Sequence, residues 1–279
     1  MFSRDDLNLR DDVTLITGYI DIGSFNKGHP DIFRSKRDYM TWMKIFSKIR
    51  NPVVAFIEKQ EDQQYFSDIR TQGGLQNLTI IRNVQRNATW AFSLLPRIRE
   101  VLAKGHYPKH YPNTVVPEYQ PIQHIKYEYV NDVAKHNPFR TKYFAWIDIG
   151  LFREIAEKNV KPFKLYLPPN MDLSRVAYNE VTPARDVTTQ DIFRNNLYWV
   201  CGCFFIGARP TVLRWTVEYM NYTEKYLGQG LANTDQRVIY AMQRNDSPAM
   251  RIQVYKPLNK ADPWFDLGYR CREEGLKRM

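Results

Sequence analysis

The side chains best suited to chemistry in this 279-residue chain are carboxylates, and Asp148 comes first. It follows residues 143–147, a short apolar and aromatic run that is typical of a strand buried on both faces. In open α/β sheets, ligands bind at the carboxyl ends of the strands. A carboxylate there is costly to bury unless it is paired, hydrogen-bonded or bound to a metal. The position predicts a ligand-binding acid, and the alternative is a cap for a helix that begins near Phe152.

A second junction suited to ligand binding follows residues 13–20, a predicted strand that contains Gly18 and is broken at Asp21. Glycine at such a junction lets the backbone approach a ligand closely. Arg34 and Arg37 lie one helical turn apart, and guanidinium groups fit the oxygens of a diphosphate. Neither G-x-G-x-x-G nor G-K-[ST] occurs, so the sequence supports neither a dinucleotide fingerprint nor a P-loop.

Alternating strands and helices must position these residues. The predicted strands are residues 13–20, 53–57, 78–84, 143–147, 197–207 and 252–255, and the predicted helices are residues 30–50, 59–72, 90–102, 123–136, 211–226 and 233–242. The repeated order of strand, helix and strand in the first half is typical of a parallel βαβ series in a Rossmann-like layer. The chain is therefore expected to be an α/β protein.

Composition narrows the class further. Hydrophobic residues make up 43% of the chain, yet no apolar run reaches the roughly 18 residues that a membrane span needs. The first twelve residues contain no apolar signal region, so we expect no transmembrane segment and a cytoplasmic location. Cys201, Cys203 and Cys271 are expected to be reduced core thiols, because the first two lie inside a hydrophobic run and lack C-x-x-C spacing.

The net charge of +10 favours a polyanionic partner, such as nucleic acid, a nucleoside diphosphate, an acidic glycan or an anionic membrane surface. The basic residues are spread through the chain and form no basic tail or stripe. This pattern disfavours nucleic acid and is compatible with a pocket for a sugar nucleotide.

Two blocks of sequence carry a family resemblance. They are residues 143–150 (YFAWIDIG), preceded by a helix with Tyr129 and Asp132, and residues 14–23 (TLITGYIDIG), followed by Arg37, Tyr39 and Trp42. In composition and order, these blocks resemble the HtrL/YibB-like family over most of the first two thirds of the chain. The resemblance implies a glycosyltransferase with a GT-A type fold, which has a mixed, mainly parallel central sheet flanked by helices. The length and composition favour a single domain over residues 1–279, and the resemblance implies that it has a nucleotide-sugar half (1–150) and an acceptor half (151–279).

For the donor side, the resemblance implies a nucleoside-diphosphate sugar, with a UDP-hexose or UDP-pentose such as UDP-xylose expected. In the GT-A fold the aspartate after the central strand holds a divalent metal, Mn²⁺ or Mg²⁺, which stabilises the leaving diphosphate through hard oxygen ligands. Gly150 replaces the second acid of the usual D-x-D. Either Asp262 or Asp266 is then expected to contribute oxygen, or Lys256 and Lys260 are expected to neutralise phosphate charge. The donor-binding candidates are Thr17, Gly18, Tyr19, Asp21, Arg34, Arg37, Asp148, Gly150, Lys256 and Lys260, and the candidate metal ligands are Asp148 and Asp262.

On the acceptor side, Asp235 stands in Asn-Thr-Asp-Gln at the predicted start of a helix. Thr or Asp at this point is ordinary capping chemistry. It is also similar to the acid that faces the acceptor in several GT-A enzymes, and an inverting transferase needs a base for the acceptor hydroxyl. Asp235 and Asp148 are therefore the catalytic candidates, and inversion is slightly favoured. The acceptor-binding candidates, for an oligosaccharide or glycoconjugate, are Glu180, Asp191, Trp199, Gly202, Asp235 and Gln236, with Glu180 and Asp191 as reserve bases.

Two alternatives remain at this point. A basic nucleic-acid-binding protein, or a metal-dependent nuclease that uses Asp21, Asp148 and Asp235, would explain the charge but not the βαβ order. An inactive glycan-binding module would keep the donor site without the chemistry.

Overall fold

The computed structural model describes residues 9–246, 248–258 and 263–278. The strands are β1 (Arg10–Tyr19), β2 (Phe25–Lys27), β3 (His29–Arg34), β4 (Val53–Ile57), β5 (Thr79–Asn83), β6 (Thr141–Ile147), β7 (Ala177–Asn179), β8 (Phe204–Ala208) and β9 (Gln253–Tyr255). The helices are α1 (Lys36–Met43), α2 (Gln60–Gln72), α3 (Trp90–Ser93), α4 (Leu95–Ala103), α5 (Tyr119–His136), α6 (Thr189–Arg194), α7 (Arg209–Gly228), α8 (Asp235–Arg244) and α9 (Asp266–Leu276). Short 3₁₀ helices cover Lys44–Ser47, Gln76–Leu78, Arg86–Ala88 and Arg153–Ile155.

Within the described residues, seven strands form one sheet in the order β5-β4-β1-β6-β8-β7-β9. β5, β4, β1 and β6 run parallel, β8 is antiparallel to both β6 and β7, and β9 is parallel to β7. The chain passes from β1 to β4 on one side and later returns to place β6 on the other. This reversal of strand order makes a switch point between the carboxyl ends of β1 and β6, where ligands bind in sheets of this kind.

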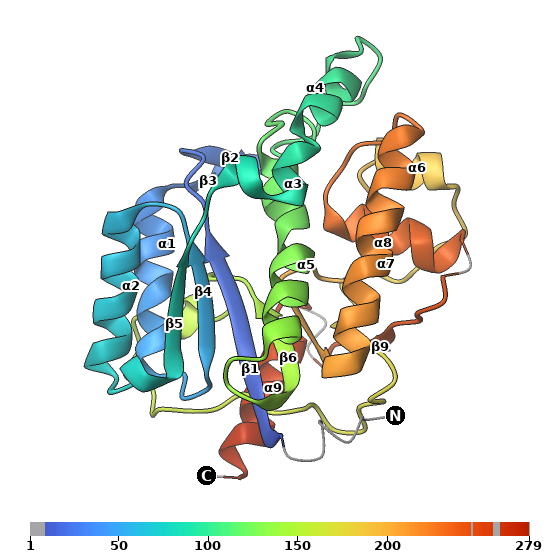
Figure 1. Ribbon diagram of the computed structural model, residues 1–279. Coiled ribbons are helices and arrows are strands. Elements are labelled where there is room, and N and C mark those ends of the chain that lie inside the picture. The colour runs from blue at the N-terminus through green and yellow to red at the C-terminus, as the bar shows by residue number, and fades with distance from the viewer. Residues whose placement is uncertain (1–8, 247, 259–262, 279) are drawn as a thin grey trace.

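Helices cover both faces of the sheet, so the molecule has three layers (Figure 1). α1 and α2 lie on one face, over a core that includes Leu15, Ala55 and Ala145. α5 and α7 lie on the other, over a core that includes Ile16 and Phe144. Successive strand residues face opposite layers, which is why the central strands are apolar throughout.

The sequence analysis predicted most of this architecture. The mixed, mainly parallel sheet flanked by helices is confirmed, and β4 has the predicted bounds. The helix predicted from residue 30 is wrong at its start, because residues up to Arg34 belong to β3. α1 begins after Ser35, whose backbone N–H and hydroxyl lie 2.8 and 2.9 Å from the Asp38 carboxylate and fix the first turn there.

The strand predicted over residues 197–207 is confirmed only at its end, as β8. The segment before β8 holds a disulfide between Cys201 and Cys203, so the prediction of reduced thiols is wrong for these two cysteines. Their Cα atoms lie 5.4 Å apart, whereas residues i and i+2 of a strand lie about 6.6 Å apart, so the backbone is folded back here. Cys271 is a free, buried cysteine, as predicted.

None of the helices in the described ranges combines the length and apolar character required to cross a bilayer.

Candidate functional site

A cavity of about 500 Å³ opens at the carboxyl ends of β1 and β6. Its wall includes Gly18 and Tyr19 at the end of β1, Asp21 just after that strand, and Asp148 and Gly150 after β6. The volume lies in the range of pockets that bind cofactor-sized or drug-sized molecules. The switch point of the sheet therefore carries a hollow large enough for a small-molecule ligand.

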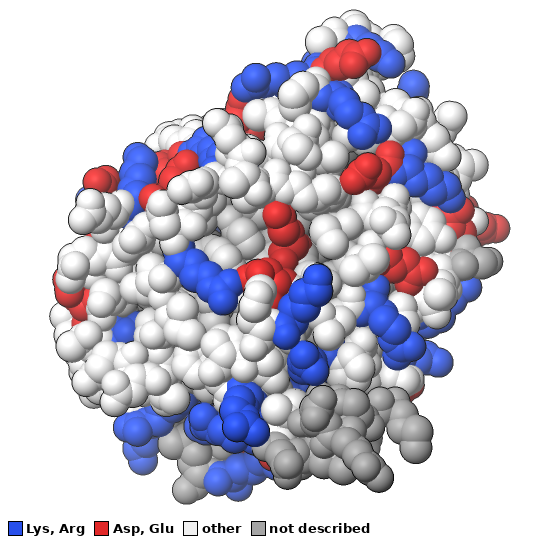
Figure 2. Space-filling model, in the orientation of Figure 1, with Lys and Arg blue, Asp and Glu red and all other residues white. Residues whose placement is uncertain are grey.

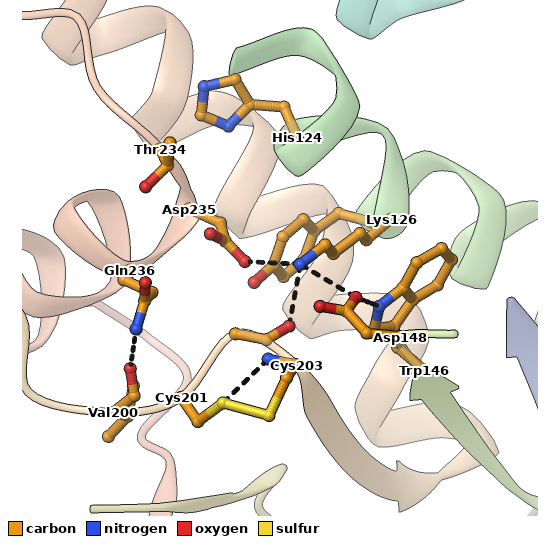
Figure 3. Close-up of polar contacts among 12 residues, drawn as sticks. His124, Lys126, Trp146, Asp148, Val200, Cys201, Cys203, Thr234, Asp235 and Gln236 are labelled. Atoms are coloured by element: carbon orange, nitrogen blue, oxygen red, sulfur yellow. Dashed lines mark hydrogen bonds and ion pairs between the residues drawn. A yellow bond between two sulfur atoms is a disulfide. The ribbon is translucent and has the colours of Figure 1, made fainter. Parts of the chain in front are cut away.

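Asp148 lies at the end of β6 with 36% of its side chain exposed. Its backbone N–H donates to the Cys203 carbonyl at 2.8 Å, and the Trp146 Nε1–H donates to its Oδ1 at 2.5 Å (Figure 3). The carboxylate therefore does not cap the short helix Arg153–Ile155, which has Phe152 at its N-cap position. The neighbouring indole fixes one carboxylate oxygen, and the side chain borders the cavity.

Lys126 of α5 links Asp148 to Asp235 (Figure 3). Its Nζ lies 3.2 Å from Asp148 Oδ1 and 3.3 Å from Asp235 Oδ2, and it donates to the Gly202 carbonyl at 2.9 Å. An ammonium has three N–H groups, so these contacts use all of them. Burial acts to lower the pKa of Lys126, but the carboxylates of Asp148 and Asp235 outweigh it and raise that pKa. Lys126 is therefore charged at neutral pH.

Asp235 is the first residue of α8, and its side chain is 2% exposed. A Cβ atom at Gly202 would lie 2.1 Å from Asp235 Oδ2, so only glycine leaves room for the carboxylate. The segment that carries Gly202 is fixed beside α8, because Gln236 Nε2 donates to the Val200 carbonyl at 2.8 Å. The disulfide loop and the start of α8 thus hold this acid at the cavity wall.

Basic side chains outnumber acidic ones around the cavity. The basic residues are Lys27, Arg34, Lys126, Arg153 and Arg237, and the acidic residues are Asp21, Asp148 and Asp235. Arg237 donates to Thr234 Oγ1 at 3.2 Å and to the Asn196 carbonyl at 2.7 Å, and burial lowers its pKa to about 10. The surplus of cations suits an anionic ligand.

The cavity brings together nine of the predicted site residues. They are Gly18, Tyr19, Asp21, Arg34, Asp148, Gly150, Gly202, Asp235 and Gln236. Burial acts to raise the pKa of the Asp21 carboxyl, but hydrogen bonds from Lys59 and from the Gly23 N–H, both at 2.9 Å, together with nearby lysine charges outweigh it and lower that pKa. A Cβ at Gly150 would lie 3.0 Å from the Trp42 ring, so glycine at this position allows the ring to pack on the loop after β6.

Other predicted site residues lie away from the cavity. Thr17 is buried in β1, and Arg37 and Lys256 are exposed elsewhere. Glu180 accepts a hydrogen bond from Trp199 Nε1 at 3.2 Å, and Asp191 forms the capping box of α6 with Thr188. These six side chains are absent from the cavity wall that the structure describes. Lys260 and Asp262 lie outside the described residues.

Comparison with protein families covers nearly the whole chain. Residues 11–273 match a family described as bacterial protein of unknown function, HtrL_YibB. The chain belongs to the HtrL/YibB family. No curated protein is similar enough to this HtrL/YibB chain to count as a relative.

The residues of this HtrL/YibB site fit a divalent metal poorly. Across the described ranges, no three His, Cys, Asp or Glu side chains gather as metal ligands would. Asp148 Oδ1 already contacts the Trp146 indole and the Lys126 ammonium. A dication at the other oxygen would lie close to a buried positive charge, which opposes its binding. The predicted partner ligand, Asp262, lies outside the described residues.

The sequence analysis missed Lys27, Lys126, Arg153 and Arg237. The sequence pattern could have identified Lys126, because it lies four and seven residues before Val130 and Val133, on the same apolar face of the predicted helix. A lysine within an apolar helical row is costly to bury unless it is paired with carboxylates. No sequence pattern could have identified Lys27, since its place at the cavity depends on how the β2–β3 hairpin folds over α5.

Proposed function

We propose that this HtrL/YibB chain is a glycosyltransferase of GT-A type that moves a sugar from a nucleoside-diphosphate donor to a glycan acceptor. The observation that carries the proposal is the pairing of Asp148 with Asp235 through Lys126 at the switch-point cavity. A UDP-sugar, of a hexose or a pentose such as xylose, is the favoured donor.

The two acids suit different roles because their surroundings differ. Asp148 is partly exposed at the end of β6, so its outer oxygen can accept hydrogen bonds from donor hydroxyls. Asp235 is buried at the wall and faces the same cavity. We assign to Asp235 the role of the base that takes the acceptor hydroxyl proton. The acceptor oxygen then bonds to the anomeric carbon, and the bond from that carbon to the diphosphate oxygen breaks with inversion.

A nucleic-acid-binding protein or a nuclease is less well supported. On the face drawn in Figure 2, most of the surface is uncharged, Lys and Arg side chains are interspersed with Asp and Glu in the upper part, and several Lys and Arg side chains gather near the lower edge. Nucleic-acid binding favours an extended basic stripe or patch, and the charges over the upper part of that face are interspersed instead. A nuclease of the expected kind would use Asp21, but a hydrogen bond to Lys59 occupies that carboxylate.

The test is a thermal-shift screen of nucleotide sugars, with and without Mn²⁺, followed by assays of nucleotide release. A ligand that binds only the folded state at a hundred times its Kd adds about 2.7 kcal/mol of stability. Asp148→Asn should keep the fold and lose sugar transfer. Asp68→Asn, an exposed change on α2, is the matched control and should transfer normally.

The glycosyltransferase proposal fails if no nucleotide sugar raises the melting temperature in either condition and Asp148→Asn changes nothing that the control does not. Donor binding without any transfer or hydrolysis would instead select the inactive glycan-binding module.

A further inference from the structure

The two-stranded sheet β2–β3 forms one wall of the cavity. β2 pairs with β3 in antiparallel fashion, and the backbone N–H of Gly28 donates to the Tyr111 carbonyl at 3.0 Å. Lys27 and Arg34, at the ends of the two strands, both line the cavity. The hairpin therefore presents two cations to the space in front of Asp148.

Lys27 points to the cavity side of α5. Its ammonium donates to the hydroxyl of Tyr119 and lies 4.6 Å from the centre of that ring. Lys27 is exposed and borders the open cavity, and the protein atoms around its ammonium lower the pKa of Lys27 to about 8. The ammonium is therefore protonated at neutral pH, and its N–H groups that do not contact Tyr119 can donate to an anionic ligand in the cavity.

Trp42 connects Arg34 to the loop that carries Asp148. Its guanidinium is 5.2 Å from the centre of the Trp42 ring, and the Arg153 guanidinium is 5.9 Å from the same ring. Trp42 in turn packs on Gly150, two residues after Asp148. Stacking of this kind orients the planar guanidinium groups, which bind phosphate oxygens in pairs.

The remaining cavity cations serve the protein itself. Lys126 uses its three N–H groups on Asp148, Asp235 and the Gly202 carbonyl. Arg237 holds the start of α8 and the loop at Asn196. The phosphate-binding role is therefore assigned to the two hairpin cations, Lys27 and Arg34, and Arg153 borders the same space.

We propose that Lys27 and Arg34 of the β2–β3 hairpin, with Arg153, bind and neutralise the leaving diphosphate in place of a divalent metal. This inference rests on the proposed nucleoside-diphosphate donor. It replaces the expected Mn²⁺ or Mg²⁺ because the Asp148 carboxylate already shares a buried ammonium. As the sugar–oxygen bond breaks, charge on the departing diphosphate is met by fixed cations.

The experiment is calorimetric titration of the full chain with UDP, GDP and ADP separately, in EDTA and in Mn²⁺. We expect one of these to bind with the same affinity in both. Lys27→Gln and Arg34→Gln should each weaken that binding about tenfold or more, because each removes a charge-assisted hydrogen bond. Arg34→Lys, which keeps the charge and loses the fork, should lie between. Lys104→Gln and Arg214→Gln, exposed away from the cavity, are matched controls and should bind normally.

Near-ultraviolet circular dichroism of each variant establishes that it is folded. Clearly tighter binding in Mn²⁺ than in EDTA would overturn the metal-free inference and leave the proposed function standing. Metal-independent binding that is unchanged in both hairpin variants would overturn the assignment to the hairpin. Failure of all three nucleotides to bind in either condition would remove the proposed function and this inference together.

Discussion

Replacing Lys126 by Met tests the central interaction of the site. At an effective dielectric constant near 20, each contact of about 3.2 Å to a carboxylate corresponds to roughly 5 kcal/mol of attraction before desolvation. The cost of burying the ammonium offsets much of this. Breaking a buried pair by removing one partner typically costs about 3–5 kcal/mol, because it leaves an uncompensated charge. We expect Lys126→Met to lose that much stability near neutral pH, mostly through Asp235.

The pH dependence and a second substitution separate this explanation from a packing defect. Without Lys126, an uncompensated negative charge stays buried, and added protons relieve it, so the stability deficit of the variant should shrink at acidic pH. Lys126→Met/Asp235→Asn should recover part of the loss, since it removes both buried charges. Lys44→Met, which removes an exposed pair with Glu157, should cost about 0–1 kcal/mol.

Urea denaturation followed by tryptophan fluorescence, near pH 7 and near pH 5, measures these differences. A loss below about 1 kcal/mol near neutral pH would refute the reasoning. So would a double variant that is no more stable than Lys126→Met alone, because the deficit would then have no electrostatic origin.

Two further predictions follow from the same neighbourhood. Gly202→Ala should displace Asp235, because the new Cβ would lie 2.1 Å from a carboxylate oxygen. We expect the free energy of unfolding to fall by about 1–3 kcal/mol and sugar transfer to be lost. Gly105→Ala, whose Cβ would contact nothing within 4 Å, is the control in the same urea and transfer assays, and equal losses in both would contradict the prediction. Burial lowers the pKa of His124 from 6.5 to about 4, so the unfolded chain binds more protons between these values and stability falls as the pH drops through them. That pKa shift corresponds to about 3 kcal/mol of stability that is lost on acidification. The His124→Gln variant should not lose this part of its stability in acid, and an equal loss in both proteins would refute the prediction.

The sequence predicts the layers well because they depend on local periodicity. Strands β4 and β6 contain short apolar runs that are followed by the polar residues Glu58 and Asp148, and their placement follows from that pattern. The position of Asp148 at a cavity follows in turn, because the carboxyl ends of parallel strands share one edge of the sheet. The same pattern does not predict the disulfide loop before β8, because an apolar run does not indicate where the backbone folds back.

Some of the candidates that were selected by residue type alone line the cavity, and others lie away from it. Glu180 and Trp199 hydrogen-bond to each other and lie away from the cavity wall, while Gly202, only three residues after Trp199, lines it. Which side of a loop faces a cavity depends on contacts between distant segments, here between Val200 and Gln236. Lys27 shows the same dependence, because its contact with Tyr119 joins residues 92 positions apart. Local pattern holds no information about such pairs.

The linked charges of Asp148, Lys126 and Asp235 bear on the proposed reaction as a unit. Before transfer, two carboxylates and one ammonium leave the group with one net negative charge. When Asp235 takes the acceptor proton, its attraction for Lys126 falls, and the ammonium is then balanced by Asp148 alone. The group becomes neutral as the diphosphate acquires negative charge. Proton uptake by Asp235 would therefore make the cavity more positive at the step in which the leaving diphosphate gains negative charge. In this way the base and the departing diphosphate would be coupled electrostatically without direct contact.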